Sequence, residues 1–360
     1  MPEQKKSSIN MDFYAPTFVV EVNGQKLAMD ISNAIISVSV SEQTEKASTF
    51  SLQVDNHELK WQDHSLFKLG NKVTIKMGYV NNLHSIIFGK INGIQVNYPA
   101  GGAPTLSVRG IDLLDEFIKK SPEETLSLDN ISYSDVVKQI AGKVGVDCKV
   151  DATSGKQKKV VISKNITYYK FLNELAPRLN YMFYVRDQKL YFVKQKIDKE
   201  LATLTWGKSL ISFNTQLSLQ KQATKVEVRC QNPQTNETII GRASASDVEK
   251  VESGGKTGSE LMSGLGMSRT ITINNRPVFS QQDADDMAKA ELKRANSKLV
   301  QGNGSCIGIP DLVPNGYLVL DNLGKRFSGK YKITSTTHSL SSSGYTTNFV
   351  VERNSNNEPS

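Results

Sequence analysis

Closely spaced glycines are the first candidates for chemistry in this 360-residue chain, because such glycines can cradle phosphate groups. In one stretch, Gly302 and Gly304 are followed by Gly308. A dinucleotide fingerprint needs a different spacing and a helix whose N-terminus holds the pyrophosphate. The residues around Gly304 instead predict strand after strand, so we reject a dinucleotide site.

A second stretch, Gly255-Lys256-Thr257, resembles the end of a phosphate loop. The first glycine of such a loop would fall at the position of Lys250. The whole segment from Ser244 to Met267 is rich in Gly, Ser and Lys, a composition typical of a mobile loop. We therefore predict a mobile loop over 244–267 and no nucleotide site.

The histidines and cysteines form no metal-binding or catalytic pattern in the sequence. The histidines have no metal-like partner at one-turn or two-residue spacing, and the cysteines lie far apart in strand-like segments. We interpret the cysteines as buried, reduced thiols and His338 as a hydrogen-bonded residue at the edge of a β-barrel. The residues concerned are His57, His64, His84, His338, Cys148, Cys230 and Cys306.

Neighbouring carboxylates are the last candidates, since two acids in one cleft can act as acid and base. Glu123-Glu124 falls in a predicted turn. Asp283 and Asp285-Asp286 fall in the first turn of a predicted helix, where acids favour the helix dipole. The sequence contains no serine elbow. We predict no catalytic residue, no metal ligand and no cofactor.

The composition is that of a globular protein with two or three domains. Apolar residues make up 38% of the chain, and no stretch approaches the ~20 apolar residues that a membrane span requires. No apolar run follows the N-terminal basic residues, so we expect no secretory signal, and the reduced cysteines fit a protein made in the cytoplasm. The net charge of +8 comes from 44 basic and 36 acidic residues that alternate along the chain. This favours a solvated surface, with a polyanion partner as the minor alternative.

An internal repeat organises the middle of the chain. In Ile131–Val146 and again in Ile166–Tyr181, an apolar residue precedes a hydroxyl residue, and apolar residues then recur at helical spacing. The predicted N-caps are Ser132 and Thr167, and the predicted C-terminal caps are Gly145 and Asn180. Each copy is predicted to be a short amphipathic helix that runs into a strand, which makes this region a small α+β unit.

Alternating apolar residues predict short strands on both sides of this unit. The strands before it, closed by glycine- and asparagine-containing turns, favour a barrel or sandwich. After Leu201 strands return, and Ser280 is the predicted cap of a helix over 280–297. The predicted strands include Phe18–Val22, Ala34–Val40, Thr49–Val54, Lys72–Met77, Ser85–Ile91, Thr105–Gly110, Ala223–Cys230 and Tyr317–Leu320.

Short motifs in these segments resemble a known family. Phe171-Leu172-x-x-Leu175-Ala176, then Asn180-Tyr181-x-Phe183-Tyr184-Val185 and Lys189-Leu190-Tyr191-Phe192, resemble the middle of the phage late control gene D family. Motifs in the first strands and in the glycine-rich C-terminal strands extend the resemblance from about Phe18 to Arg353. The residues that carry it are Gly110, Asp112, Phe171, Leu175, Tyr181, Phe183, Tyr191, Gly304, Gly308, Pro310, Pro314, Gly316, Gly329, Tyr331, His338, Gly344 and Tyr345. Asn315 departs from the family pattern, because it separates the usual proline and glycine and is expected to lengthen that turn.

The late control gene D family comprises baseplate hub proteins of contractile phage tails, and the same fold forms the front part of type VI secretion spike proteins. The resemblance implies a β-rich α+β fold with two antiparallel, tail-tube-like β-barrels and an α+β domain between them. The implied boundaries are 1–115 for the first barrel, 116–200 for the α+β domain, 201–354 for the second barrel and 355–360 for a polar tail.

The resemblance also implies a structural role. Three copies with two barrels each would form a pseudo-sixfold ring that joins a sixfold tail tube to a threefold spike. The implied partners are further copies of the chain, a tail tube protein, a spike protein and other baseplate components, with nucleic acid at most as passing cargo and no membrane. The resemblance implies synthesis in the bacterial cytoplasm and assembly into the tail or baseplate of a phage or phage-tail-like particle. Two alternatives remain: a tail-associated cell-wall hydrolase and a polyanion- or glycan-binding β protein.

Overall fold

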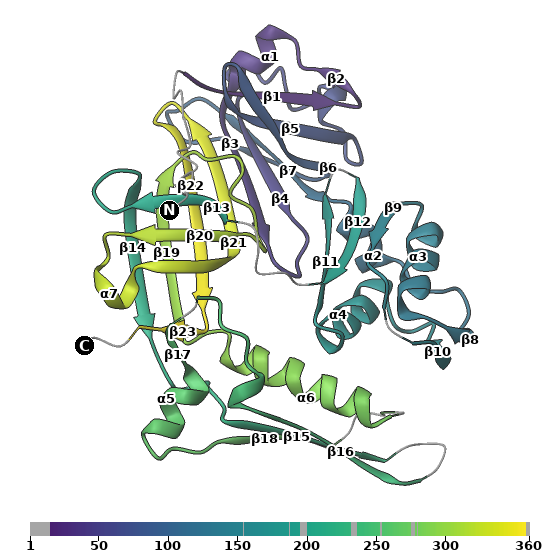
Figure 1. Cartoon of the computed structure of the whole chain (residues 1–360). Helices are drawn as coiled ribbons and strands as arrows, with labels where there is room; N and C mark the ends of the chain where they lie inside the picture. The colour runs from purple at the N-terminus through teal and green to yellow at the C-terminus, as the bar shows by residue number, and fades with distance from the viewer. Residues whose placement is uncertain are drawn as a thin grey trace.

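The computed structural model describes residues 15–153, 155–186, 188–194, 200–231, 236–252, 254–274, 278 and 280–357. Its main feature is a 13-stranded sheet, accompanied in these residues by four sheets of two or three strands. Helices lie beside the small sheets (Figure 1). The β-rich α+β class predicted from the sequence is confirmed.

The N-terminal strands alternate in burial because every second side chain points into one hydrophobic core. Val38, Leu52 and Ile75 are fully buried in this first core. The elements of this region are β1 (Pro16–Val22), β2 (Gln25–Lys26), α1 (Met29–Ala34), β3 (Ile35–Gln43), β4 (Thr49–Asp55), η1 (Ser65–Phe67), β5 (Lys72–Tyr79), β6 (Asn82–Asn97) and β7 (Thr105–Asp112).

The repeated helices are confirmed as α3 (Tyr133–Val144) and α4 (Tyr168–Arg178). The Ser132 hydroxyl accepts the amide of the third residue after it at 3.2 Å, and Thr167 does the same at 3.2 Å. Gly145 follows α3 in the left-handed conformation, as a C-terminal cap requires. Asn180 also has a positive φ of 54°. Local capping chemistry therefore sets the ends of both helices.

Both helices bury their apolar faces in a second core, which also takes the inner face of a three-stranded sheet. Leu172 from α4 and Phe192 from that sheet are fully buried in it. The other elements of this region are α2 (Leu114–Lys119), β8 (Leu126–Ile131), β9 (Asp147–Val150), β10 (Gln157–Ile162), β11 (Tyr181–Arg186) and β12 (Lys189–Lys194).

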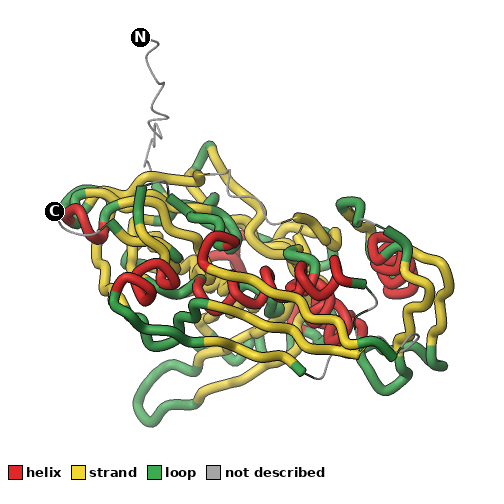
Figure 2. The backbone as a smooth tube through the Cα atoms, turned by 60° about the horizontal axis from the view of Figure 1, so that its bottom comes forward, coloured by secondary structure: helices red, strands yellow, loops and turns green. Residues whose placement is uncertain are grey.

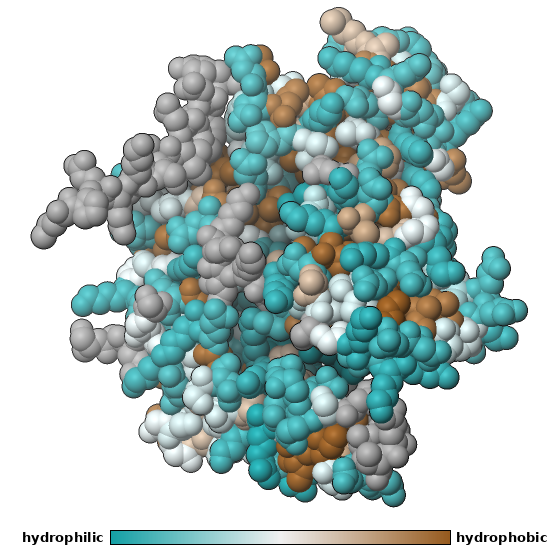
Figure 3. Space-filling model, turned by 45° about the vertical axis from the view of Figure 1, so that its right-hand side comes forward, coloured by the Kyte–Doolittle hydropathy of each residue, from teal (hydrophilic) through white to brown (hydrophobic). Residues whose placement is uncertain are grey.

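Strands from residues 200–217 and 300–353 enclose a third core, in which Leu204, Leu318 and Val351 are fully buried. On the face shown in Figure 3, hydrophilic side chains cover most of the surface and hydrophobic ones are scattered in small groups. The elements are β13 (Glu200–Thr205), β14 (Leu210–Leu217), β19 (Val300–Ile307), β20 (Tyr317–Asp321), α7 (Gly324–Phe327), β21 (Gly329–Ser341) and β22 (Gly344–Arg353).

A fourth core lies between a three-stranded sheet and the predicted helix over 280–297, which is confirmed as α6 (Gln281–Asn296) with Ser280 as its cap. Ala284, Ala288 and Leu292 of this helix are fully buried against the sheet. Figure 2 shows the three strands in front of helices, projecting along one side of the molecule. The strands are β15 (Lys225–Gln231), β16 (Thr238–Ser244) and β18 (Thr270–Ile273).

The large sheet joins the first and third regions through one strand pair. Its order is β14-β19-β22-β21-β3-β4-β7-β6-β5-β1-β2, with β20 on β21 and β13 on β20. The junction is the antiparallel pair β3·β21, in which Val40 lies opposite His338. Strands β21 and β22 extend past the third core, so Leu340 and Tyr345 belong to the first core. The two-barrel arrangement and the predicted domain boundaries stay predictions.

The predicted mobile loop over 244–267 is wrong for much of its length. It contains η2 (Ala245–Asp247), β17 (Lys256–Thr257) and α5 (Gly258–Gly264). The side chain of Thr257 accepts the amide of Glu260 at 3.2 Å, and the Glu260 carboxylate accepts the amide of Thr257 at 2.7 Å. This reciprocal pair is a capping box whose Thr-x-x-Glu pattern was readable in the sequence.

The predicted polar tail over 355–360 is also wrong at its start. Ser355 and Asn356 form β23 (Ser355–Asn356), which pairs with β17 and is buried. Because its side chains are polar, a hydrophobicity pattern does not detect this strand. Its backbone pairs with β17, and the side chain of Asn356 accepts a hydrogen bond from Arg353. The last residues of the predicted tail, 358–360, lie outside the described part of the chain.

Candidate functional site

Three of the signature glycines lie directly beneath aromatic rings. A Cβ at Gly110 would stand 2.1 Å from the ring of Phe50, and one at Gly308 would stand 2.1 Å from the ring of Tyr345. A Cβ at Gly304 would meet a ring atom of Phe349 at 2.7 Å. No real side chain tolerates such distances, so glycine is required there for the sheet to close over its core.

A buried polar node surrounds His338, close to the junction of the first and third regions. Its imidazole is 0% exposed. The Nε2 atom lies 3.0 Å from the carbonyl oxygen of Leu312, which can only accept, so Nε2 carries the proton. The Nδ1 atom therefore accepts from the hydroxyls of Tyr345 and Thr347, at 3.0 and 3.1 Å.

Electrostatics keep this node neutral. Burial lowers the pKa of His338 to about 4, because a charged imidazolium would lose its hydration there. Burial also raises the pKa of the Tyr345 hydroxyl and that of the neighbouring Cys306 thiol, the latter to about 12. A neutral imidazole and protonated hydroxyl and thiol groups suit a hydrogen-bonded support for the surrounding strands.

The node also ties the first region to the loop after β19. The hydroxyl of Tyr79, at the end of β5, donates to the carbonyl of Gly308 at 2.9 Å. His84 on β6 lies 3.0 Å from the Asp311 carboxylate. The Thr347 hydroxyl accepts the amide of Ile309 at 3.0 Å. Residues far apart in the sequence thus meet at one seam, to which Pro310 also belongs by its place in this loop.

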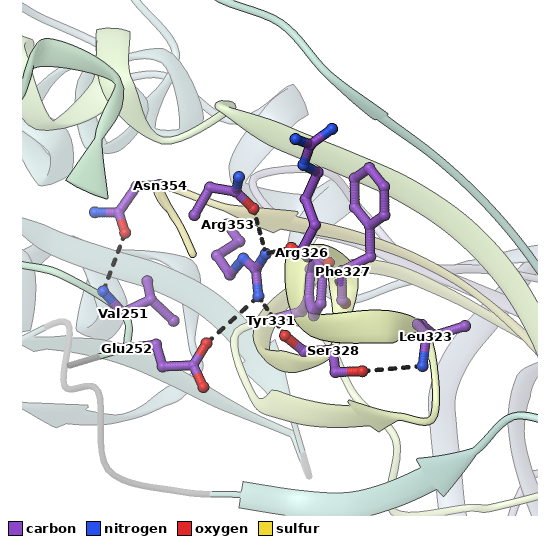
Figure 4. A network of polar contacts seen from close by, with 10 residues as sticks. Val251, Glu252, Leu323, Arg326, Phe327, Ser328, Tyr331, Arg353 and Asn354 are labelled. Atoms are coloured by element: carbon purple, nitrogen blue, oxygen red, sulfur yellow. Dashed lines mark hydrogen bonds and ion pairs between the residues drawn. The ribbon is translucent and has the colours of Figure 1, made fainter. Parts of the chain in front are cut away.

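A second polar node surrounds Arg353, the last residue of β22 (Figure 4). The guanidinium is 0% exposed on its side chain and lies 3.4 Å from the carboxylate of Glu252. It donates to the carbonyls of Ser328 at 2.9 Å and Arg326 at 2.7 Å, and to the side chain of Asn356 at 3.0 Å. It therefore links the C-terminal segment, the segment before α5 and the turn before β21.

Two signature residues explain how this charge is accommodated. The ring of Tyr331 lies beneath the guanidinium, with 4.6 Å between the guanidinium carbon and the ring centroid. Gly329 has a φ of 130°, and a Cβ there would stand 2.2 Å from the Glu252 carboxylate. Arg353 and Glu252 themselves were missed by sequence reasoning. Arg353 ends a strand that mixes apolar and polar residues, and Glu252 lies outside any strand, so no local pattern singles either residue out.

The turn around Asn315 follows the sequence prediction in part. Asn315 has a positive φ of 69° and donates its amide to the carbonyl of Ile333 at 2.9 Å. Gly316 closes the turn with a hydrogen bond to Val313, and a Cβ there would stand 2.2 Å from the side chain of Leu201. The extra residue is thus absorbed by a left-handed turn beside Pro314.

The signature residues of the α+β region mostly form core. Leu175 and Phe183 are buried, and Phe171 and Tyr181 pack against the same second core. Tyr191 is different, because its ring stacks on Tyr184 with centroids 5.0 Å apart and planes 3° apart. These residues do not meet the His338 node.

Asp112 and Gly344 complete the signature. Asp112 is 7% exposed and accepts the amides of Ser48 and Leu114 at 2.8 and 2.9 Å, which ties the end of β7 to two neighbouring segments. Burial raises the pKa of Asp112 to about 6. Gly344 has a φ of 108° in the β21–β22 hairpin turn. Both residues support backbone geometry.

Other sequence candidates remain apart in the structure. Within the described residues, no group of three or more His, Cys, Asp or Glu side chains is placed to bind a metal ion. Of the described helices, none is both long and apolar enough to cross a membrane. His57 and His64 lie in the turns between β4 and β5, and neither is among the hydrogen-bond partners of His338.

Comparison with solved structures shows the fold. The 43 kDa tail protein of prophage MuSo2 from Shewanella oneidensis matches with a TM-score of 0.72 at 16% identity, covering 94% of this chain and 98% of that chain. A tail protein from Neisseria meningitidis MC58 matches with a TM-score of 0.71 at 13% identity, covering 94% and 97%. The chain thus has the fold of these phage tail proteins.

A component of the Escherichia coli type VI secretion system, described as similar in structure to T4 bacteriophage tail proteins, matches with a TM-score of 0.54 at 13% identity. That match covers 95% of this chain and 79% of the other. No curated protein sequence matches the chain. The resemblance to the late control gene D family stays a prediction, because the family model that matches the chain describes a different family. This matching model is described as the Alg8 N-terminal domain and covers residues 14–342, so the chain belongs to the Alg8 N-terminal domain family.

Proposed function

We propose that the chain is the structural hub of a contractile tail or injection particle, a homotrimeric adaptor between a sixfold tail tube and a threefold spike. Its partners would be two further copies of itself, the tube protein, the spike protein and other baseplate components. The role is mechanical and includes no catalytic step. Tail proteins and a type VI secretion component among the solved structures of the same fold support the proposal.

The observation that carries the proposal is the pairing of two strand-rich regions within one chain. Each has its own hydrophobic core, and the two regions meet edge to edge through β3 and β21. Three such chains in a closed ring present six strand-rich regions around one threefold axis. This arrangement would let one face match sixfold symmetry while the other matches threefold symmetry.

The seam between the two regions is built to keep them in fixed relation. The β3·β21 pair adds side-chain hydrogen bonds between Ser39 and Ser339 at 3.3 Å and between Ser41 and Thr337 at 3.1 Å. His338, which alternates with these residues along β21, adds its hydrogen bonds on the opposite face of the sheet, and the Tyr79 hydroxyl bonds to the carbonyl of Gly308. An adaptor that transmits force between a tube and a spike requires such a rigid pair of regions.

Native mass spectrometry of the tagged chain, co-expressed with the tube and spike proteins of its own particle, tests the proposal. We expect an assembly with three copies of this chain, three of the spike and a multiple of six of the tube protein. A chain that binds neither protein, or that binds them one to one as a monomer, would refute the hub function. Retention of the complex at high salt would exclude a purely electrostatic association.

A further inference from the structure

A cavity of about 160 Å³ lies where several parts of the molecule meet. Its wall takes Glu45 from the turn after β3, Asn180 from the turn between α4 and β11, and Lys293 from α6, together with Lys332 on β21 and Glu352 on β22. Liquid water occupies about 30 Å³ per molecule, so the space corresponds to roughly five waters or one small organic molecule.

Two opposite charges stand side by side on the floor of this cavity. Lys332 and Glu352 are directly opposite each other on antiparallel strands, so their side chains leave the sheet on the same face. Glu352 is only 9% exposed. Among the described residues, no hydrogen bond or ion pair joins Lys332 to Glu352, and both line the cavity. Neither is among the fully enclosed polar side-chain atoms that lack a partner, so water or a ligand in the cavity can solvate both charges.

The charges act on each other from a distance longer than an ion pair. Burial lowers the pKa of Lys332, and the nearby carboxylate of Glu352 opposes that change. Burial raises the pKa of Glu352, and the ammonium groups of Lys332 and Lys298 oppose it. A gap therefore separates a hydrogen-bond donor from an acceptor, and both face the same space.

The rest of the wall is mixed in character. Lys293 donates to the side-chain oxygen of Asn180 at 3.0 Å, which fixes its ammonium at one side. Glu249 adds a carboxylate, and Pro177 and Ala290 add apolar surface. Positive and negative groups are thus present together, so the cavity favours a ligand with both charges over a plain anion or cation.

We propose that this cavity binds a small zwitterion of the α-amino acid class. The ligand carboxylate would accept from the Lys332 ammonium, and its ammonium would donate to the Glu352 carboxylate. The carboxylate and the ammonium of an α-amino acid are bonded to the same carbon atom. This short separation matches the charges of Lys332 and Glu352, which are close but not in contact. A small apolar ligand side chain would face Pro177 and Ala290.

Such a ligand would have a mechanical effect as well. The wall joins the large sheet to α6 and to the α4–β11 segment, so a bound molecule would bridge regions with separate cores. Binding would stabilise their relative positions. This inference does not depend on the hub function, because it concerns only the isolated chain.

Isothermal titration calorimetry and thermal unfolding of the wild-type chain test the proposal, with glycine, L-alanine, L-glutamate and L-lysine as probes. Acetate and methylammonium serve as controls that carry one charge each. We expect saturable binding of glycine or L-alanine, with a Tm rise of roughly a few degrees at saturation, and no comparable effect of the controls. Failure of all four amino acids to bind would overturn the proposal, as would equal binding of acetate or methylammonium.

Two variants that each remove one charge, Lys332→Gln and Glu352→Gln, locate the site. Each removes one charge-assisted contact, so each should weaken binding by roughly 10- to 100-fold. The matched controls Lys208→Gln and Glu58→Gln make the same changes of charge at exposed positions and should leave affinity unchanged. Unchanged affinity in both cavity variants would place binding elsewhere and refute the site. If a cavity variant does not fold, the wild-type comparison of amino acids with acetate and methylammonium decides alone.

Discussion

Replacing His338 should change how the stability of the fold depends on pH. The ordinary pKa of a histidine is 6.5, and burial lowers that of His338 to about 4. The unfolded chain therefore binds the proton more tightly than the folded chain between these values. The contribution of His338 to the free energy of unfolding is therefore complete above about pH 6.5 and is lost as pH falls toward about 4.

The size of this contribution follows from the same two values. A difference of about 2.5 pKa units between unfolded and folded chains corresponds to about 3 kcal/mol over the whole window. About 2 kcal/mol of this should already be lost near pH 5, where the folded imidazole is still mostly neutral. The side chain is 0% exposed, so solvent screening does not reduce the value.

Other buried groups act in the opposite direction, so wild-type stability alone cannot isolate the histidine. Burial raises the pKa of Asp112 to about 6 and also raises that of Glu352. Stability held by these carboxyl groups is complete at low pH and is lost as pH rises through their folded pKa values. The informative quantity is therefore the difference between the wild type and His338→Gln at each pH.

His338→Gln keeps an amide donor for the carbonyl of Leu312 and removes the titrating group. Urea denaturation should show the variant to be less stable by roughly 1–3 kcal/mol near pH 7.5, because the hydroxyls of Tyr345 and Thr347 lose their acceptor. Near pH 5 this deficit should shrink by about 2 kcal/mol. A deficit that stays constant across the range would refute the assignment of a neutral, buried imidazole.

Three further predictions concern stability. Arg353→Lys should lower the free energy of unfolding, measured by urea denaturation, by roughly 3–5 kcal/mol, because lysine cannot replace all the buried donors to the carbonyls of Ser328 and Arg326. The same change at the exposed Arg229 should lower it by less than ~1 kcal/mol. Equal effects at the two positions would contradict the Arg353 node. Gly308→Ala should abolish soluble folding, because its Cβ would overlap the Tyr345 ring. The control Gly142→Ala, in open space on α3, should raise the free energy of unfolding by up to ~1 kcal/mol. A soluble Gly308→Ala chain with the wild-type Tm would show that the ring position is wrong. Thr257→Ala should lower stability by about 1 kcal/mol through loss of the α5 cap and should increase proteolysis in 244–267; an unchanged cleavage rate would restore the mobile-loop interpretation of that segment.

Local chemistry made part of the fold predictable. Ser132, Thr167, Gly145 and Asn180 set helix ends through hydrogen bonds within a few residues, so their roles could be inferred from spacing. The alternating strands were predictable for the same reason, since period-two burial is a property of each strand. The mobile-loop prediction failed because it was based on the Gly, Ser and Lys content of the segment, whereas the Thr-x-x-Glu pattern at Thr257 indicates the start of a helix.

Long-range pairing was not predictable from these patterns. Nothing local to β21 shows that it pairs with β3 or that Tyr345 completes the first core. The polar residues Ser355 and Asn356 are buried only because β17 and Arg353 meet them there. His338 was correctly interpreted as hydrogen-bonded, but its partners come from other parts of the chain and only the folded arrangement identifies them.

The solution mass of the purified chain, measured by light scattering alone and with the separate spike protein, tests the hub proposal most directly. One chain has a mass of 39.8 kDa, so a trimer has three times that value. The proposal predicts a trimer in at least one of the two conditions. A strict monomer in both would contradict it, because two strand-rich regions per chain give sixfold matching only when three chains close a ring.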